Sequence, residues 1–272
     1  MKSNVLQLKK MIGAQCYLML HKQGFWFSFG VMLFINMISY LSNVYHSIGR
    51  DVFCLMRATD YFSLAGWNNA ITYITIFFPI LIAFPVAYAS FDEEAGKSSV
   101  YGTLRSSYVV YYAAKAITAF VAGAVLIWIP CGINLFWNAI TFVKSPNGVD
   151  GRWYSVMYFS KKGIAFEHFY HLHPMAYGVI FVLAVGIFAG LCSVFAYSVS
   201  NFIRRYKVLC VLPVFLLFFV TGALQYPGMV INEYLEYPWK ADCVPGMLWV
   251  SLVLLVVSVI LLIRFIKKKE FV

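Results

Sequence analysis

Residues 175–199, MAYGVIFVLAVGIFAGLCSVFAYSV, contain no Asp, Glu, Lys or Arg from one end to the other. An α-helix needs about 20 apolar residues to cross a hydrocarbon core about 30 Å thick, and this stretch is long enough. Five further stretches with little or no charge occur along the chain. The sequence therefore predicts six membrane spans, at about residues 25–48, 69–90, 109–138, 175–199, 208–224 and 247–266.

The composition of the whole chain agrees with this interpretation. Hydrophobic residues make up 62% of the 272 positions and charged residues only 12%, whereas soluble domains carry about 25% charged residues. The evenly spaced alternating segments of an outer-membrane barrel are absent from the sequence, and helices satisfy their own backbone groups in lipid. We expect an all-α polytopic membrane protein with a single transmembrane domain over residues 1–272.

Residues 1–22 are too polar for a span and show a helical pattern instead. The apolar side chains of the segment share one face: Val5, Leu8, Ile12, Cys16 and Met19. Polar side chains take the opposite face, which predicts an amphipathic helix lying in the membrane interface. A cleavable signal peptide is the alternative, but the apolar part is short and no small-x-small cleavage site follows it.

The distribution of charge predicts the orientation. If both termini are cytoplasmic, most of the 21 basic residues and the whole net charge of +10 lie on the cytoplasmic side, in agreement with the positive-inside rule. We therefore expect a multi-pass protein of the cell (plasma) membrane with residues 139–174 and 225–246 outside. The basic charge reflects membrane orientation, and we expect no nucleic acid partner.

Several classes of activity lack their sequence signature. The chain contains neither the GxxxxGK[ST] loop of ATP-binding proteins nor an HExxH zinc motif, and no pair of carboxylates falls within a predicted span. Ion-coupled carriers commonly need such intramembrane carboxylates. The sequence thus argues against an ion-driven carrier and against ATP binding by this chain.

A histidine-rich segment lies between the third and fourth predicted spans. It combines one carboxylate with three imidazoles: Glu167, His168, His171 and His173. One interpretation is a polar interface segment whose histidines are solvated or hydrogen-bonded. The alternatives are a zinc or copper site and a pH-sensitive lid, although the spacing matches no defined metal template.

The six cysteines contain no CxxC pair, which argues against zinc-finger and thioredoxin-like sites. Cys54 and Cys243 both fall in predicted outer loops, where a disulfide is chemically permitted. The sequence leaves open whether these two cysteines meet.

Residues 91–115, FDEEAGKSSVYGTLRSSYVVYYAAK, separate the second and third predicted spans with a charged, glycine-containing segment. Asp92 stands four residues before Gly96, and Lys115 follows as the next span begins. An apolar patch lies between them, at Val100, Tyr101 and Leu104. With six spans, both ends inside and an interfacial N-terminal helix, this pattern resembles a type-2 ABC transporter permease, although Lys97 stands where that family usually has threonine.

The resemblance implies a coupling helix, at about residues 93–106 within the 91–108 loop, that docks on a separate ATP-binding subunit. The residues implied in coupling are Asp92, Glu93, Glu94, Gly96, Lys97, Val100, Tyr101, Leu104 and Arg105. ATP and Mg would be bound by that partner, and this chain would bind no cofactor and be no enzyme itself. A plain solvated loop is the alternative, in which the acids only stabilise a helix N-terminus.

The resemblance also implies that residues 221–245 form two short re-entrant helices at the outer mouth of the pathway, and that a second permease chain, identical or related, completes it. Polar residues of spans one, two and five are then candidates for lining the pathway: Asn36, Ser39, Asn43, Thr72, Thr75 and Thr221. These side chains could equally form the interhelical hydrogen bonds that are common in membranes.

Three functions remain open from the sequence. The first is the membrane subunit of an ATP-driven ABC exporter of an amphiphilic cargo, such as an antimicrobial peptide, a lipid-linked molecule or a drug, with membrane lipid around it. The second is a membrane sensor or scaffold that uses the histidine-rich outer segment as its receptor. The third is a membrane-embedded enzyme, which lacks a visible catalytic set.

Overall fold

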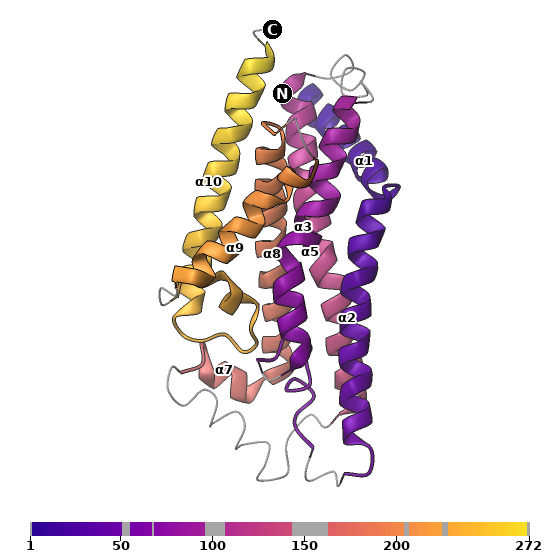
Figure 1. Ribbon diagram of the computed structural model, residues 1–272, viewed down its shortest axis with the longest axis vertical. Helices are drawn as coiled ribbons and strands as arrows, with labels where there is room; N and C mark the ends of the chain where they lie inside the picture. The colour runs from indigo at the N-terminus through magenta and orange to yellow at the C-terminus, as the bar shows by residue number, and fades with distance from the viewer. Residues whose placement is uncertain are drawn as a thin grey trace.

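The computed structural model describes residues 2–50, 55–66, 68–95, 107–142, 163–203, 207–224 and 228–270. Within these segments the chain is helical, contains no extended β-strand and forms only two isolated β-bridges (Figure 1). The α-helices are α1 (Lys2–Leu20), α2 (Gln23–Ser47), α3 (Asn69–Ala95), α5 (Tyr108–Thr141), α7 (Glu167–Leu172), α8 (Pro174–Ser200), α9 (Leu212–Leu224) and α10 (Cys243–Glu270). Two short 3-10 helices are η2 (Lys207–Cys210) and η3 (Ile231–Leu235).

The all-α fold is confirmed within the described residues, and it is compatible with a polytopic membrane protein. Five described helices are long and apolar enough to cross a membrane, namely α2, α3, α5, α8 and α10. The fifth predicted span, residues 208–224, is different. Most of it is α9, which has 13 residues and is only about 20 Å long at 1.5 Å per residue. As described, α9 is too short to cross the hydrocarbon core alone.

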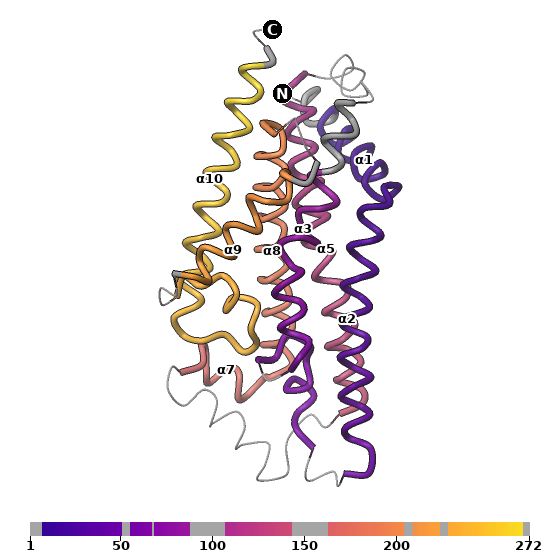
Figure 2. The backbone as a smooth tube through the Cα atoms, in the orientation of Figure 1, coloured from indigo at the N-terminus to yellow at the C-terminus, as the bar shows by residue number. Residues whose placement is uncertain are grey.

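The long helices form one bundle whose two ends differ. α1 begins and α10 ends at the same end of the bundle, which we call the termini end (Figure 1). Residues 55–66 and α7 lie at the opposite end, called the distal end. α5 and α8 pack on each other in the middle, while α2 and α10 stand on opposite sides of the bundle (Figure 2).

Glycines let α5 and α8 approach closely. A Cβ added to Gly190 of α8 would lie 2.8 Å from the carbonyl oxygen of Phe120, and one added to Gly123 of α5 would lie 2.8 Å from the carbonyl oxygen of Ala189. Small residues commonly bring membrane helices together in this way, because dispersion contacts replace the hydrophobic effect between helices in lipid.

The predicted N-terminal helix forms and packs on the bundle. Its expected apolar face is turned inward, since Leu8, Ile12 and Cys16 are partly buried and Met19 is buried. The thiol of Cys16 lies 3.7 Å from the hydroxyl of Thr118 on α5. The apolar face of α1 therefore contacts α5 of the same chain.

Residues 236–241 lie between two other distal segments and form one isolated β-bridge with each. The amide of Tyr237 donates to Leu64 O at 2.8 Å, and the amide of Ala165 donates to Trp239 O at 2.9 Å. Within the described residues, η3 is the one short helix between α9 and α10. Pro245 lies inside the first turn of α10 instead of breaking it. This arrangement differs from the expected pair of re-entrant helices, because backbone groups of Tyr237 and Trp239 bond to neighbouring segments instead of within a helix.

Candidate functional site

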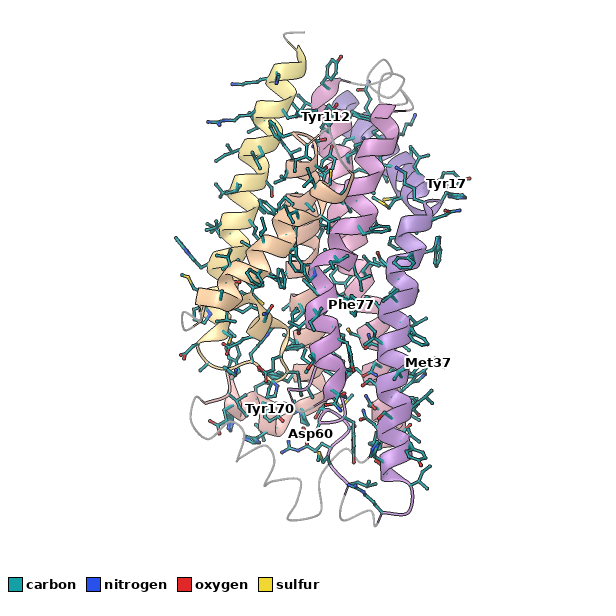
Figure 3. The ribbon with its side chains drawn as sticks, viewed as in Figure 1. Tyr17, Met37, Asp60, Phe77, Tyr112 and Tyr170 are labelled. Carbon is teal, nitrogen blue, oxygen red and sulfur yellow. The ribbon has the colours of Figure 1, made fainter. Side chains whose placement is uncertain are left out.

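Two charged side chains are buried at the distal end. Arg57 and Asp60 are 7% and 3% exposed, and both precede α3. Tyr170 of α7 donates its phenol hydroxyl to Asp60 Oδ1 at 3.3 Å, and the guanidinium carbon of Arg57 lies 5.6 Å from the centre of the Tyr170 ring. Figure 3 shows Asp60 and Tyr170 close together at this end of the bundle.

Burial sets the ionisation of this cluster. It raises the pKa of Asp60 from 3.8 to about 6, and the positive charge of Arg57 opposes part of that increase. Burial also raises the pKa of Tyr170, and the negative charge of Asp60 adds to the effect. Tyr170 thus stays protonated and acts as a hydrogen-bond donor, while Asp60 titrates near neutral pH.

Aromatic rings pack around Tyr237 and complete a distal cap, defined here as residues 55–66, α7 and residues 228–242. The ring of Tyr237 lies 5.2 Å from Phe181, 5.7 Å from Phe62 and 5.7 Å from Tyr177 between ring centres. All three contacts have the edge-to-face geometry that favours aromatic pairs. The aromatic content of residues 221–245 was the only sequence signal for this cap, and it did not indicate the partners.

Polar side chains of α2, α5 and the cap form a buried network beside these rings. Ser63 Oγ donates to Asn36 Oδ1 at 2.6 Å, and Asn134 Nδ2 donates to Asn36 O at 2.8 Å. Asn134 Oδ1 accepts from the amide of Ser63 at 3.1 Å and from Asn138 Nδ2 at 3.0 Å. These hydrogen bonds hold Ser63 between α2 and α5.

The candidate pathway residues take different positions. Ser39 accepts a bond of 2.9 Å from Asn68, and Asn43 donates to Tyr61 O at 2.7 Å. Thr221 donates to Leu217 O within its own helix. Asn36 of α2 bonds to Asn134 of α5 and to Ser63, whereas the partners of Ser39 and Asn43 lie in the segment that precedes α3. Thr72 is exposed and Thr75 half-buried on α3. A pathway-lining role for the six stays a prediction.

The coupling stretch begins inside a helix. α3 continues through Asp92, Glu93 and Glu94 to Ala95, so these acids occupy the last turn of α3, whereas the sequence interpretation placed them at a helix N-terminus. The rest of the predicted coupling residues lie outside the described part of the chain: Gly96, Lys97, Val100, Tyr101, Leu104 and Arg105.

Lys115 lies near the start of α5, at the same end of the bundle. Its side chain is buried, and Nζ lies 4.8 Å from the centre of the Tyr111 ring. A cation over an aromatic face is stabilised by the ring quadrupole. The lysine of the proposed family pattern therefore contacts the interior of this end of the bundle.

The histidine-rich segment forms α7 without a metal-like arrangement. His171 Nε2 lies 3.7 Å from Glu167 Oε1, one helical turn away, and the ring of His173 lies 5.8 Å from that of Phe169. Across the described segments, no three His, Cys, Asp or Glu side chains converge in a way that could hold a metal ion. The zinc or copper alternative gains no support from this geometry.

Cys243 is buried at the start of α10, where its thiol lies 3.6 Å from Glu233 Oε2. Glu233 also accepts from Lys240 Nζ at 2.8 Å, and Glu236 lies 3.2 Å from the same ammonium. Cys54 is outside the described residues. A disulfide between Cys54 and Cys243 stays a prediction.

A laterally open groove separates α2 from α3. Its volume is about 370 Å³, which is within the range of roughly 300–1,000 Å³ for small-molecule sites. Phe34 and Ile38 line it from α2, and Tyr73 and Phe77 line it from α3. Figure 3 shows Phe77 on α3 at mid-height in the bundle. No sequence pattern predicted this groove.

Comparisons with protein-family models, curated proteins and solved structures find no match for this chain. The architecture and the contacts described above are therefore the basis of the functional proposal that follows.

Proposed function

We propose that this chain is the membrane-spanning permease subunit of an ATP-driven exporter of the type-2 ABC class. It forms half of a pathway for an amphiphilic cargo, a second permease chain forms the other half, and residues 91–108 couple it to a separate ATPase. Both termini are cytoplasmic in this proposal, so the distal cap faces outward.

The acids at the end of α3 carry the proposal. The C-terminal end of a helix has a partial negative charge and favours cations, so Asp92, Glu93 and Glu94 are unfavourable there on electrostatic grounds. Helix stability therefore does not explain them. A basic surface on a soluble partner would explain these acids, because charge complementarity steers and orients protein contacts.

The length of α3 suits the transmission of movement. Its 27 residues correspond to about 40 Å at 1.5 Å per residue. α3 runs from Asn69, beside the distal cap, to the acids at the termini end. A displacement imposed by an ATPase at one end would thus reach the groove and the cap. Pro79 and Pro85 lie within the helix, and prolines are the usual points at which helices bend.

The test is the purification of the chain from its native membrane in mild detergent, followed by mass spectrometry of the proteins that co-purify. We expect an ATP-binding cassette subunit in stoichiometric amount, together with the second permease if that is a different chain. The chain alone should hydrolyse no ATP. Purification without any ATPase would overturn the proposal and favour the sensor or scaffold function, which would then be sought at the histidines of α7.

A further inference from the structure

The groove between α2 and α3 is polar at one end and apolar along the rest. Ser39, Ser42, Asn68 and Asn69 line its distal end, whereas Phe34 and Phe77 line it nearer the middle of the helices. None of the residues that line the groove carries a charge at neutral pH. The groove thus matches a ligand with an uncharged polar group at one end and a hydrocarbon chain at the other.

Two side chains at the polar end have unused hydrogen-bonding capacity. Asn68 donates to Ser39 at 2.9 Å and accepts from the amide of Ala70 at 3.0 Å, so these groups already have protein partners. Ser42 and Asn69 are exposed, and within the described residues their side chains form no hydrogen bond. A ligand headgroup would therefore contact Ser42 and Asn69.

The length of the groove corresponds to one leaflet. Phe34 and Ser42 are eight positions apart on α2, which is about 12 Å along the helix axis. One leaflet contributes about 15 Å of the hydrocarbon core. The side chains of Phe34, Ile38, Tyr73 and Phe77 are 43–63% exposed, so a lipid chain can enter the groove from the side.

We propose that this groove binds one acyl chain of an amphiphile with an uncharged, hydrogen-bonding headgroup, in the leaflet at the distal end of the bundle. The headgroup bonds to Ser42 and Asn69, and the chain lies along Ile38 and Phe77. This inference deepens the proposed function, on which it rests, by naming the chemical class of the cargo. Binding needs no ATPase, and it is therefore measured apart from transport.

The test uses the full chain in lipid nanodiscs and a monoacylglycerol that carries a photoreactive diazirine in its acyl chain. After irradiation, mass spectrometry maps the labelled residues. We expect saturable labelling of α2 and α3 around the groove, which unlabelled monoacylglycerol suppresses. A lysophosphatidylglycerol probe with the same chain should label the groove at least about tenfold less, which corresponds to about 1.4 kcal/mol.

Two substitutions fill the groove and one leaves it open. Ser42→Trp at the polar end and Ile38→Trp in the apolar part both replace exposed side chains that line it, and each should lower the labelling at least about tenfold. Leu41→Trp is the matched control, because Leu41 is 51% exposed on the same helix but does not line the groove.

Three results would overturn the inference. The first is labelling that both groove-filling variants leave unchanged. The second is labelling spread equally over the exposed face of α10, which indicates ordinary surrounding lipid. The third is equal labelling of the groove by the anionic probe, which contradicts an uncharged headgroup. Any of these three results, obtained with a chain that still co-purifies with an ATPase, would reject the cargo class and leave the transport proposal standing.

Discussion

Tyr170 donates its phenol hydroxyl to the buried carboxylate of Asp60 across a separation of 110 residues in the sequence. The bond joins α7 to the segment that precedes α3, and Arg57 lies over the same ring. A buried carboxyl group thus lies where two distal segments meet. Its protonation bears directly on the stability of the cap.

Asp60 should make the stability of the protein dependent on pH. The pKa of Asp60 is about 6 in the folded protein, whereas the ordinary value of 3.8 applies in the unfolded chain. Between these two pH values the folded state therefore binds the proton more tightly than the unfolded chain. The stabilisation is therefore fully present below about pH 4 and is lost as the pH rises through about 6. Each pKa unit is worth 1.36 kcal/mol, and the total is on the order of 3 kcal/mol.

Thermal unfolding in detergent between pH 4 and pH 8 measures this effect. The substitution Asp60→Asn keeps an acceptor for Tyr170 but cannot ionise, and we expect it to remove the decline in Tm between pH 4 and pH 6. Asp242→Asn is the control, since Asp242 is exposed in the same cap. A decline that persists in Asp60→Asn would show that other groups cause it.

Asn134→Leu should destabilise the bundle. The substitution leaves the buried amide of Ser63 without its acceptor and removes the side-chain donor to Asn36 O, and an unpaired buried group costs about 1–3 kcal/mol. Thr141→Val removes the 2.7 Å bond to Tyr40 at an exposed position, where the expected change is at most about 0.5 kcal/mol. Equal losses of thermal stability in the two variants would contradict a special role for the buried network.

Gly190→Ala should weaken the packing of α5 against α8. The added methyl group would meet the backbone oxygen of Phe120 at 2.8 Å, and overpacking of this kind typically costs about 1–3 kcal/mol. Gly132→Ala on α5 meets nothing within 4 Å, and we expect that variant to unfold no earlier than the unaltered protein. A Gly190→Ala variant as stable as Gly132→Ala would mean that the helices separate without cost.

Replacement of Glu93 and Glu94 by Gln, together with alanine at Tyr101 and Leu104, should abolish the stimulation of the partner ATPase and transport. Insertion into the membrane should be unaffected, because these positions lie beyond the second predicted span. Glu167→Gln at the distal end is the control for the loss of a carboxylate. If the variant with all four substitutions still stimulates the partner ATPase, residues 91–108 are not the coupling element.

Five of the six predicted spans coincide with long apolar helices, whereas the fifth, 208–224, coincides with the shorter α9. The fourth, expected at 175–199, is α8 at Pro174–Ser200, and the third, expected at 109–138, is α5 at Tyr108–Thr141. The length of an uncharged stretch depends only on consecutive residues, which is why the sequence alone predicts these helices. The boundary at α3 was harder to predict, since charged residues at 92–94 do not by themselves end a helix.

The distal cap shows the limit of such prediction. The family resemblance implied two short re-entrant helices within residues 221–245, yet the amide of Tyr237 bonds to the carbonyl oxygen of Leu64. The sequence contains no signal for the pairing of residues so far apart. The sequence did not predict the groove between α2 and α3 either, because a groove depends on the relative placement of two helices.

The sequence by itself determined an all-helical chain with helices long and apolar enough to cross a membrane, because a helix satisfies its backbone groups within its own segment. Only the tertiary structure decided which polar atoms pair. Asn36, for example, accepts from the hydroxyl of Ser63 through its side chain and from Asn134 through its carbonyl group. Such pairing follows from the relative placement of segments remote in the chain, and a buried polar group that lacked a partner there would be costly.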